Sequence, residues 1–240
     1  MPTTNFDYDE NLGIPRLVDV LNDNPPALNK AAIPEFIPGS KWQYSNIGYD
    51  VIQLLLEDIT GKPFQQNADE IIFRPLGMSN STFNYPLDST NKKQEAMPHD
   101  SEGTSRKPIM HSTAVAHGGL TTTPTDLAKF TSEIMLSYQG KSGKIISHEM
   151  TKKLFNKEFN LDPNLYGLPL SEGLGIFLMG EGKNLTIMHP GNNVPGLNCW
   201  LIGWPERGTG AVIMTNGANG EILTLEIISA INIIYNRKDY

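Results

Sequence analysis

Three consecutive polar residues, Tyr44, Ser45 and Asn46, lie between a proline-containing segment and an apolar stretch with helical spacing. A tyrosine at such a junction can present its phenol to a cleft, and a nearby cation would lower the phenol pKa and make it a general base. Asn46 can donate and accept hydrogen bonds, as a contact to a substrate amide requires. In the alternative interpretation, Asn46 caps the helix and Tyr44 packs on it. The local sequence alone favours this alternative.

A second polar group consists of His189, Pro190, Gly191, Asn192 and Asn193, at the end of a β-prone run. Gly191 would let a substrate approach the backbone closely, and the amide of Asn192 would then face an oxyanion. The alternative is a Gly/Asn hairpin turn after a strand, with an incidental histidine. In isolation, this motif also favours the structural alternative.

Other common catalytic and metal-binding patterns do not occur in the sequence. It has no Gly-x-Ser-x-Gly elbow, phosphate loop, Gly-x-Gly-x-x-Gly or His-Glu-x-x-His. Cys199 is the single cysteine, which excludes an internal disulfide and the Cys-rich zinc patterns. We expect no metal and no organic cofactor. Four further histidines show no metal spacing and are expected to be exposed or partly buried: His99, His111, His117 and His148.

Helices are predicted for the segments that hold the first polar group. Residues 47–59 carry apolar side chains at helical spacing and end at Gly61. Thr123-Pro124-Thr125-Asp126 indicates a helix start, with a hydroxyl cap, a proline in the first turn and an acid near the positive helix end. That helix should reach about residue 138. Shorter helices are predicted at 17–21, at 64–73 and after Ser147.

The last third of the chain predicts strands. Four short β-prone runs separated by Gly, Asn and Pro indicate consecutive antiparallel strands at 174–179, 185–189, 198–204 and 210–215. A final amphipathic helix at about 222–235 should present six apolar side chains to the sheet: Leu223, Leu225, Ile227, Ile228, Ile231 and Ile234. The sequence thus predicts an α/β fold with a mainly antiparallel sheet flanked by helices.

Composition limits the function classes. The 240 residues carry a formal net charge of −7, and this acidic balance argues against nucleic acid as a partner. No apolar run reaches the roughly 18–20 residues of a membrane-spanning helix. The N-terminal residues show neither a basic start nor an apolar middle, so the chain as written is expected to stay in the cytoplasm.

Four motifs in order carry a family resemblance. They are Pro38-Gly39-x-x-x-x-Tyr44-Ser45-Asn46-x-Gly48-Tyr49, Pro75-Leu76-Gly77-Met78 with Ser81-Thr82-Phe83, the stretch Gly118-Gly119-Leu120-Thr121-Thr122-Thr123-Pro124-Thr125-Asp126-Leu127, and His189-Pro190-Gly191. Over roughly residues 10–236 the sequence resembles the serine β-lactamase-like family of class C β-lactamases, DD-peptidases and related esterases. His189-Pro190-Gly191 falls where many members have Lys-Thr-Gly and esterase-like members have His-x-Gly.

The resemblance implies a role for each candidate residue. Members of the family form an acyl-enzyme on the serine of a Ser-x-x-Lys motif. Carried over, Tyr44 is the acid/base tyrosine and Asn46 the contact to the substrate amide. His189 replaces the family's lysine, and Gly191 with the Asn192 amide forms half of the oxyanion hole. The implied fold is β-lactamase/transpeptidase-like, with a helical lobe beside the antiparallel sheet.

The family's Ser-x-x-Lys lies upstream of the tyrosine motif, but the 43 residues before Tyr44 contain none. We therefore expect a family member whose N-terminal strands and nucleophile helix are missing. The sequence contains Ser-x-x-Lys once, from Ser89 to Lys92, in a polar segment that we interpret as a solvated loop. The expected organisation is a single domain over 1–240, with a loop-rich lead-in (1–43), a mainly helical part (44–170) and a strand meander with a closing helix (171–240).

The expected function is that of a serine hydrolase which transfers the acyl group of a lactam, a D-Ala peptide or a small ester, and which is inactive as this truncated chain. The alternative is a non-catalytic remnant or binding module. By family analogy the missing strands lie beside residues 210–215, so this edge is expected to pair with another chain in a homodimer. Family members are often periplasmic or secreted, and an export signal would lie upstream of the residues seen here.

Overall fold

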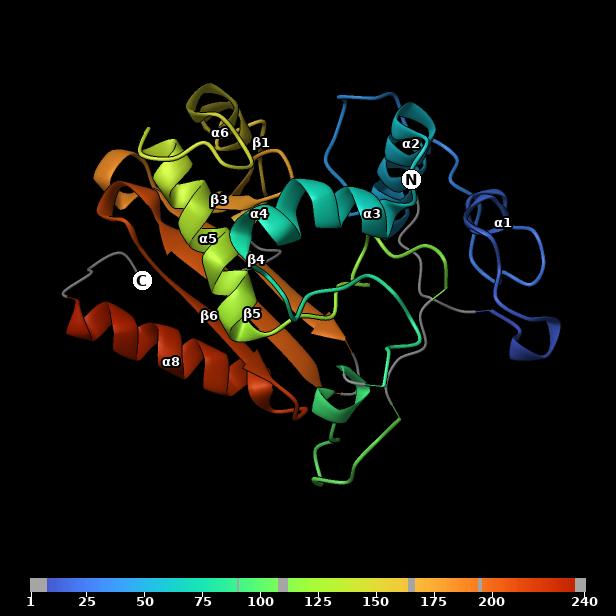
Figure 1. Ribbon diagram of the computed structural model, residues 1–240. Coiled ribbons are helices and arrows are strands. Elements are labelled where there is room, and N and C mark those ends of the chain that lie inside the picture. Colours follow the sequence, from blue (N-terminus) through green and yellow to red (C-terminus); the bar gives the residue numbers. More distant parts are fainter. Residues whose placement is uncertain (1–7, 90, 108–111, 164–166, 194–195, 236–240) are drawn as a thin grey trace. The chain divides into compact units, whose positions relative to one another are not determined.

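The computed structural model describes residues 8–89, 91–107, 112–163, 167–193 and 196–235 (Figure 1). The chain divides into two compact units, each built from separated stretches of sequence. The first unit comprises Met1–Ile71, Asn80–Gln94 and Ile109–Thr121, and the second comprises Ile72–Ser79, Glu95–Pro108 and Thr122–Tyr240. The single-domain organisation expected from the sequence stays a prediction. Among the described residues, no helix is long and apolar enough to cross a membrane.

Helices dominate the first unit. They are η1 (Glu10–Leu12), α1 (Leu17–Asn22), α2 (Asn46–Thr60), α3 (Phe64–Ala68) and η3 (Asn91–Gln94). A π-helical turn, η2 (Asp69–Phe73), and α4 (Arg74–Leu76) follow α3 along the chain, so the helix predicted at 64–73 exists but changes its winding. The helices predicted at 17–21 and 47–59 are confirmed, and Gly61 ends α2 in the left-handed conformation at φ 65°.

The cap of α2 corrects one sequence interpretation. Ser45 is the N-cap, and its hydroxyl accepts a hydrogen bond from the backbone N–H of Gly48 at 3.2 Å. Asn46 is instead the first residue of the helix. A side-chain oxygen at the N-cap satisfies an amide that has no partner within the helix, and serine does this as well as asparagine. The side chain of Asn46 is therefore not needed as the cap.

The core of the first unit is apolar, but α2 turns a partly polar face toward it. The core residues are Leu17, Val20, Leu21, Ala27, Ile47 and Ala114. Besides Ile47, the buried residues of α2 are Asp50 and Gln53. Three of the apolar residues that predict the helix, Ile52, Leu55 and Ile59, are exposed. The apolar period thus identifies the helix but not its buried side.

The second unit is built on one antiparallel meander. Its strands are β1 (Phe159–Asn160), β2 (Ser171–Glu172), β3 (Phe177–Met179), β4 (Thr186–Asn193), β5 (Leu197–Trp204) and β6 (Thr209–Thr215). They lie side by side in chain order, each antiparallel to the next. The four predicted strands are confirmed as β3 to β6, with shifted ends, and the two-residue strands β1 and β2 were not predicted. The antiparallel α/β fold expected from the sequence is confirmed.

Two long helices pack on this sheet, α5 (Pro124–Tyr138) and α8 (Gly220–Ile234). Figure 1 shows α5 crossing the strands and α8 running along β6. Thr123 caps α5 as predicted, because its hydroxyl accepts from the N–H of Asp126 at 3.2 Å. The shorter α6 (His148–Leu154) follows Ser147, also as predicted. The core of this unit combines residues of α5, β3 and β4 with residues directly beside α6, β3 and β4: Ile134, Met135, Phe155, Ile176, Leu178, Leu185 and Ile187.

The sheet-facing side of α8 differs from the expectation. Its buried residues are Gly220, Thr224, Ile228 and Asn232. Of the six apolar residues expected to face the sheet, Leu223, Leu225 and Ile234 are exposed. The small residues allow close approach, since a Cβ on Gly220 would lie 1.7 Å from the hydroxyl oxygen of Thr215. The face of α8 that packs on the sheet is therefore the one whose small residues allow close approach, and it is not the most apolar face of the helix.

Candidate active site

Tyr44 and Asn46 both belong to the first unit, at the beginning of α2. Tyr44 lies in the extended segment before the helix and is 41% exposed. Ser45 is extended as well, with φ −148° and ψ 105°, which places its hydroxyl over the first turn. Asn46 opens the helix and is partly buried. The structure thus holds the two predicted residues two positions apart at a capped helix start.

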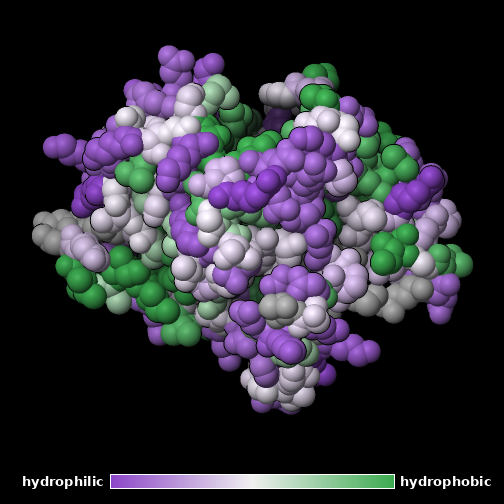
Figure 2. Space-filling view, in the orientation of Figure 1, coloured by the Kyte–Doolittle hydropathy of each residue, from purple (hydrophilic) through white to green (hydrophobic). Residues whose placement is uncertain are grey.

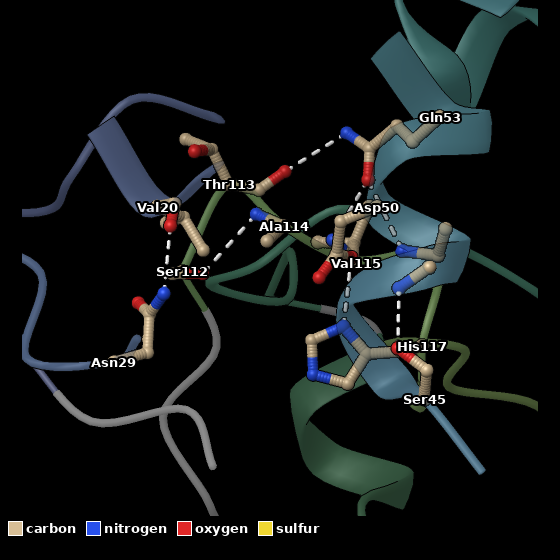
Figure 3. Close-up of polar contacts among 12 residues, drawn as sticks. Val20, Asn29, Ser45, Asp50, Gln53, Ser112, Thr113, Ala114, Val115 and His117 are labelled. Carbon is tan, nitrogen blue, oxygen red and sulfur yellow. Dashed lines mark hydrogen bonds and ion pairs between the residues drawn. The ribbon is translucent and has the colours of Figure 1, made fainter. Parts of the chain in front are cut away.

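Gln53 fastens a distant backbone segment to α2 (Figure 3). Its amide nitrogen donates to the carbonyl oxygen of Thr113 at 2.9 Å. Its amide oxygen accepts from the N–H groups of Val115 at 2.9 Å and Ala116 at 3.1 Å. These backbone groups lie about 60 residues away in sequence and belong to the same unit. One buried side chain therefore supplies three of the contacts between the helix and this segment.

One turn closer to Asn46, Asp50 meets His117 from the same segment. Nδ1 of His117 lies 2.7 Å from Oδ1 of Asp50. The side chain of His117 is 5% exposed and that of Asp50 is completely buried. His117 was expected to be exposed or only partly buried. This expectation is wrong, because the imidazole is buried in contact with the carboxylate of Asp50. His111 lies outside the described residues.

Asp50, Gln53 and His117 were not predicted from the sequence to belong to this region. A usable signal was present: Asp50 and Gln53 follow Asn46 at intervals of four and three residues, so all three share one helix face. Polar residues repeating on one face of an otherwise apolar helix indicate polar partners for that face. The identity of the partner, 67 residues away, could not be predicted without the fold.

His189, Gly191 and Asn192 lie in the second unit, within β4. His189 pairs with Leu201, Gly191 with Cys199, and Asn192 with Asn198 of β5. The hairpin turn considered as the alternative is therefore wrong at these positions, because β4 continues to Asn193. Alternation along a strand places His189 and Gly191 on the same face and Asn192 on the other.

The β3 side of this part of β4 has no strand beside it among the described residues. β3 pairs with β4 only from Thr186 to Met188. The next five residues, from His189 to Asn193, extend beyond it. A Cβ on Gly191 would approach no atom closer than 3.8 Å, and its φ is not positive. Neither packing nor backbone conformation thus requires glycine there, and its missing side chain leaves space beside His189 on one face.

The environment of His189 favours the neutral imidazole. Burial lowers its pKa below the usual value of 6.5, and a hydrogen bond with the backbone of Pro190 opposes the shift. The ring of Phe177 lies 5.8 Å from it, centroid to centroid, at 34°. A neutral imidazole can accept a hydrogen bond or a proton, which the family's lysine ammonium cannot.

Two further groups could carry nucleophilic chemistry: Ser89 in the first unit, and Cys199, which pairs with Gly191 across β4 and β5. Ser89 is exposed in a turn just before the single-turn helix η3. Cys199 is partly buried, and this burial raises the pKa of its thiol to about 11, which keeps it protonated at neutral pH. Within the described ranges, no three His, Cys, Asp or Glu side chains come together to hold a metal ion.

Comparisons with known proteins confirm the family resemblance. Residues 3–226 match the model of the Beta-lactamase family. A putative D-alanyl-D-alanine carboxypeptidase of Escherichia coli K12 is 35% identical over 77 residues, which are 32% of this chain and 18% of that protein. The carboxypeptidase/endopeptidase AmpH of Escherichia coli K12 is 27% identical over 184 residues, covering 74% of this chain and 46% of AmpH.

A solved structure shows the same fold. The penicillin-binding protein from Bacillus halodurans superimposes with a TM-score of 0.70 at 20% identity, over 90% of this chain and 62% of that one. The chain spans less than half the length of the curated relatives it matches. Since the family model matches nearly its whole length, the chain belongs to the Beta-lactamase family.

Proposed function

We propose that this chain is the substrate-binding portion of a serine hydrolase that transfers the acyl group of a lactam, a D-Ala peptide or a small ester. The observation that carries the proposal is the stretch of β4 beyond β3, from His189 to Asn193. An extended peptide can add to such a strand through main-chain hydrogen bonds. Gly191 would leave room for the reacting carbonyl beside the neutral imidazole of His189.

In this proposal each candidate residue has one role. Tyr44 transfers the proton in acylation and deacylation, and Asn46 binds the amide of the substrate. His189 accepts a hydrogen bond from the substrate or its leaving group. The backbone N–H of Asn192, next to Gly191, stabilises the oxyanion of the tetrahedral intermediate.

A binding experiment tests the β4 part of the proposal. An N-acyl-D-Ala-D-Ala peptide is titrated into ¹⁵N-labelled chain while amide resonances are followed. We expect the resonances of 189–193 to move, and the Gly191→Leu variant to abolish the movement because leucine fills the space. Gly143→Leu, at a glycine with open surroundings and no positive φ in the same unit, is the matched control. Equal shifts in the wild type and in Gly191→Leu would overturn the proposal.

We further propose that these 240 residues form no acyl-enzyme by themselves. Ser89, in the sequence's one Ser-x-x-Lys, is exposed in a turn with no long helix to orient Lys92 beside it. Intact-mass measurement after incubation with a fluorophosphonate or a penicillin should show the unmodified mass, while a class C β-lactamase treated in parallel gains the adduct. An adduct mapped to Ser89 would make Ser89 the nucleophile and contradict this proposal.

The alternative proposal is a binding module that self-associates through β6. This strand is the last of the described sheet, and its residues Ala211 to Met214 are partly exposed. Figure 2 shows hydrophobic side chains gathered over the neighbouring α8. Ile222, Leu225 and Ile233 of this helix are exposed. Sedimentation velocity at tens of micromolar should show a dimer that Val212→Lys dissociates. A monomer under these conditions would rule out the alternative.

A further inference from the structure

The first turns of α2 bury polar groups at the place where a helix usually buries apolar ones. Asn46, Asp50 and Gln53 share one face. Gln53 is satisfied by its contacts with the segment around Val115, whereas Asp50 is fully buried and meets His117. A polar face of this kind is costly unless its hydrogen bonds are made, so its geometry is tightly specified.

The contact between Asp50 and His117 is the sharpest of these restraints. The distance of 2.7 Å between Nδ1 and Oδ1 is that of a charge-assisted hydrogen bond. The second carboxylate oxygen of Asp50, Oδ2, has no hydrogen-bond partner among the described residues. The buried carboxylate therefore depends on His117.

His117 is presented by a tight turn. The N–H of Gly119 donates to the carbonyl oxygen of Val115 at 3.0 Å. A Cβ on Gly119 would lie 2.5 Å from that same oxygen, so the turn in this form excludes any larger residue. Gln53 holds the preceding backbone. The imidazole thus comes from a segment that is itself fixed on α2.

The restraint continues to the start of the helix. In an α-helix the N–H of residue i donates to the carbonyl oxygen of residue i−4, which joins Asp50 directly to Asn46. The residue before Asn46 is the cap, Ser45, and the residue before that is Tyr44. A displacement of Asp50 would therefore turn the first helical turn and the two side chains that it carries.

We propose that Asp50 and His117 are positioning residues, which fix the first turn of α2 and thereby the side chains of Tyr44 and Asn46. Both are buried, and neither takes a chemical role. The relevance to catalysis rests on the proposed function of Tyr44 and Asn46. The coupling itself concerns only the first unit and can be measured without turnover.

The test compares three variants by NMR on the full chain. His117→Leu removes the donor at similar volume, and His117→Asn keeps an N–H near the position of Nδ1. His148→Ala removes a histidine that contacts the backbone carbonyl of Ser137 in the second unit, and it is the matched control. The readouts are the amide resonances of 45–48 and the pH titration of the Tyr44 ring followed at its Cζ carbon.

We expect His117→Leu to shift both readouts, His117→Asn to restore them, and His148→Ala to leave them unchanged. If His117→Leu does not fold, the double variant Asp50→Leu/His117→Leu replaces the pair with apolar groups and avoids an unpaired buried charge. It should shift the same resonances. Unchanged readouts for 44–48 in a folded variant that lacks the pair would overturn the proposal. Failure of peptide binding in the wild type would instead count against the proposed function, since the NMR comparison uses no ligand.

Discussion

The two regions that carry the proposed site residues are held in opposite ways. The start of α2 depends on a few buried polar side chains, above all Asp50 and His117. The His189 stretch of β4 is held by a backbone ladder to β5 that covers seven residue pairs, from Ile187 to Asn193. A few strong side-chain contacts fix one precise geometry, and the loss of one contact disturbs the others. A ladder of many weaker backbone hydrogen bonds keeps its geometry when a single contact is lost. The start of α2 should therefore be much more sensitive to single substitutions.

Breaking the polar pair should have the largest effect on stability. His117→Leu leaves the buried carboxylate of Asp50 without its partner, so we expect the free energy of unfolding to fall by about 3–5 kcal/mol. Urea unfolding followed by far-UV circular dichroism measures this loss. The double variant Asp50→Leu/His117→Leu should recover most of it, because no buried charge remains. If the free energy of unfolding falls by less than about 1 kcal/mol in His117→Leu, the contact between Asp50 and His117 contributes no more than an exposed ion pair does.

Removing the cap of α2 should have an intermediate effect. Ser45→Ala takes away the acceptor for the N–H of Gly48, and the expected cost is about 1 kcal/mol, up to about 2. Ser147→Ala removes the equivalent acceptor at α6 of the second unit and serves as the matched control for stability. The two variants should lose similar stability, but only Ser45→Ala should move the Tyr44 ring resonance. If the Tyr44 ring resonance moved in both variants, the shift could not be assigned to the loss of the α2 cap.

A conservative change in the buried part of β4 should have a smaller effect. Ile187 is completely buried in the core of the second unit, and Ile187→Val removes one methylene there. We expect a loss of about 0.5–1.5 kcal/mol and unchanged amide resonances at 191–193, because the ladder to β5 remains. Thermal unfolding and an amide spectrum check both points. Displaced resonances at 191–193 would show that β4 is as sensitive as the start of α2.

The smallest effect concerns pH. The pKa of His189 is lower in the folded chain than its usual value of 6.5, so protonation favours the unfolded state. Its contribution to stability is complete above pH 6.5 and is lost as the pH falls through the folded pKa. His189→Gln should therefore lose less stability than the wild type on acidification in that window. A His189 titration midpoint above 6.5, measured by NMR, would reverse the sign.

The sequence predicts the order of the elements better than the faces they bury. Thr123 and Gly61 carry local information, since a cap or a left-handed end needs no distant partner. Strands β3 to β6 follow from β-prone runs between turn residues. The buried side of α8 could not be predicted, because the fit of Gly220 against Thr215 depends on tertiary contact. The same holds for His117, whose partner is on another segment.

The candidate residues themselves were predicted by ordered motifs rather than by local chemistry. The motifs name Tyr44 and Asn46, and the structure places them at the start of α2, where Ser45 rather than Asn46 is the cap. The motifs also name His189, Gly191 and Asn192, and the structure places them inside β4 rather than in a turn. A motif identifies candidate residues by their types and order, whereas the backbone conformation at each of them depends on strand pairing and on helix capping. Their roles in a reaction stay predictions.

The separation of Asp50 from His117 in sequence also has a consequence for biosynthesis. During translation, His117 is added to the chain 67 residues after Asp50. Translation adds about 5–20 residues per second, so roughly 3–13 s pass between the synthesis of α2 and that of the residue that completes its buried face. During that interval the carboxylate stays hydrated, and Ile47 lacks Ala114, the one member of its core cluster that is synthesised after it. The buried polar face of α2 can thus be completed only after the turn before Gly119 has left the exit tunnel.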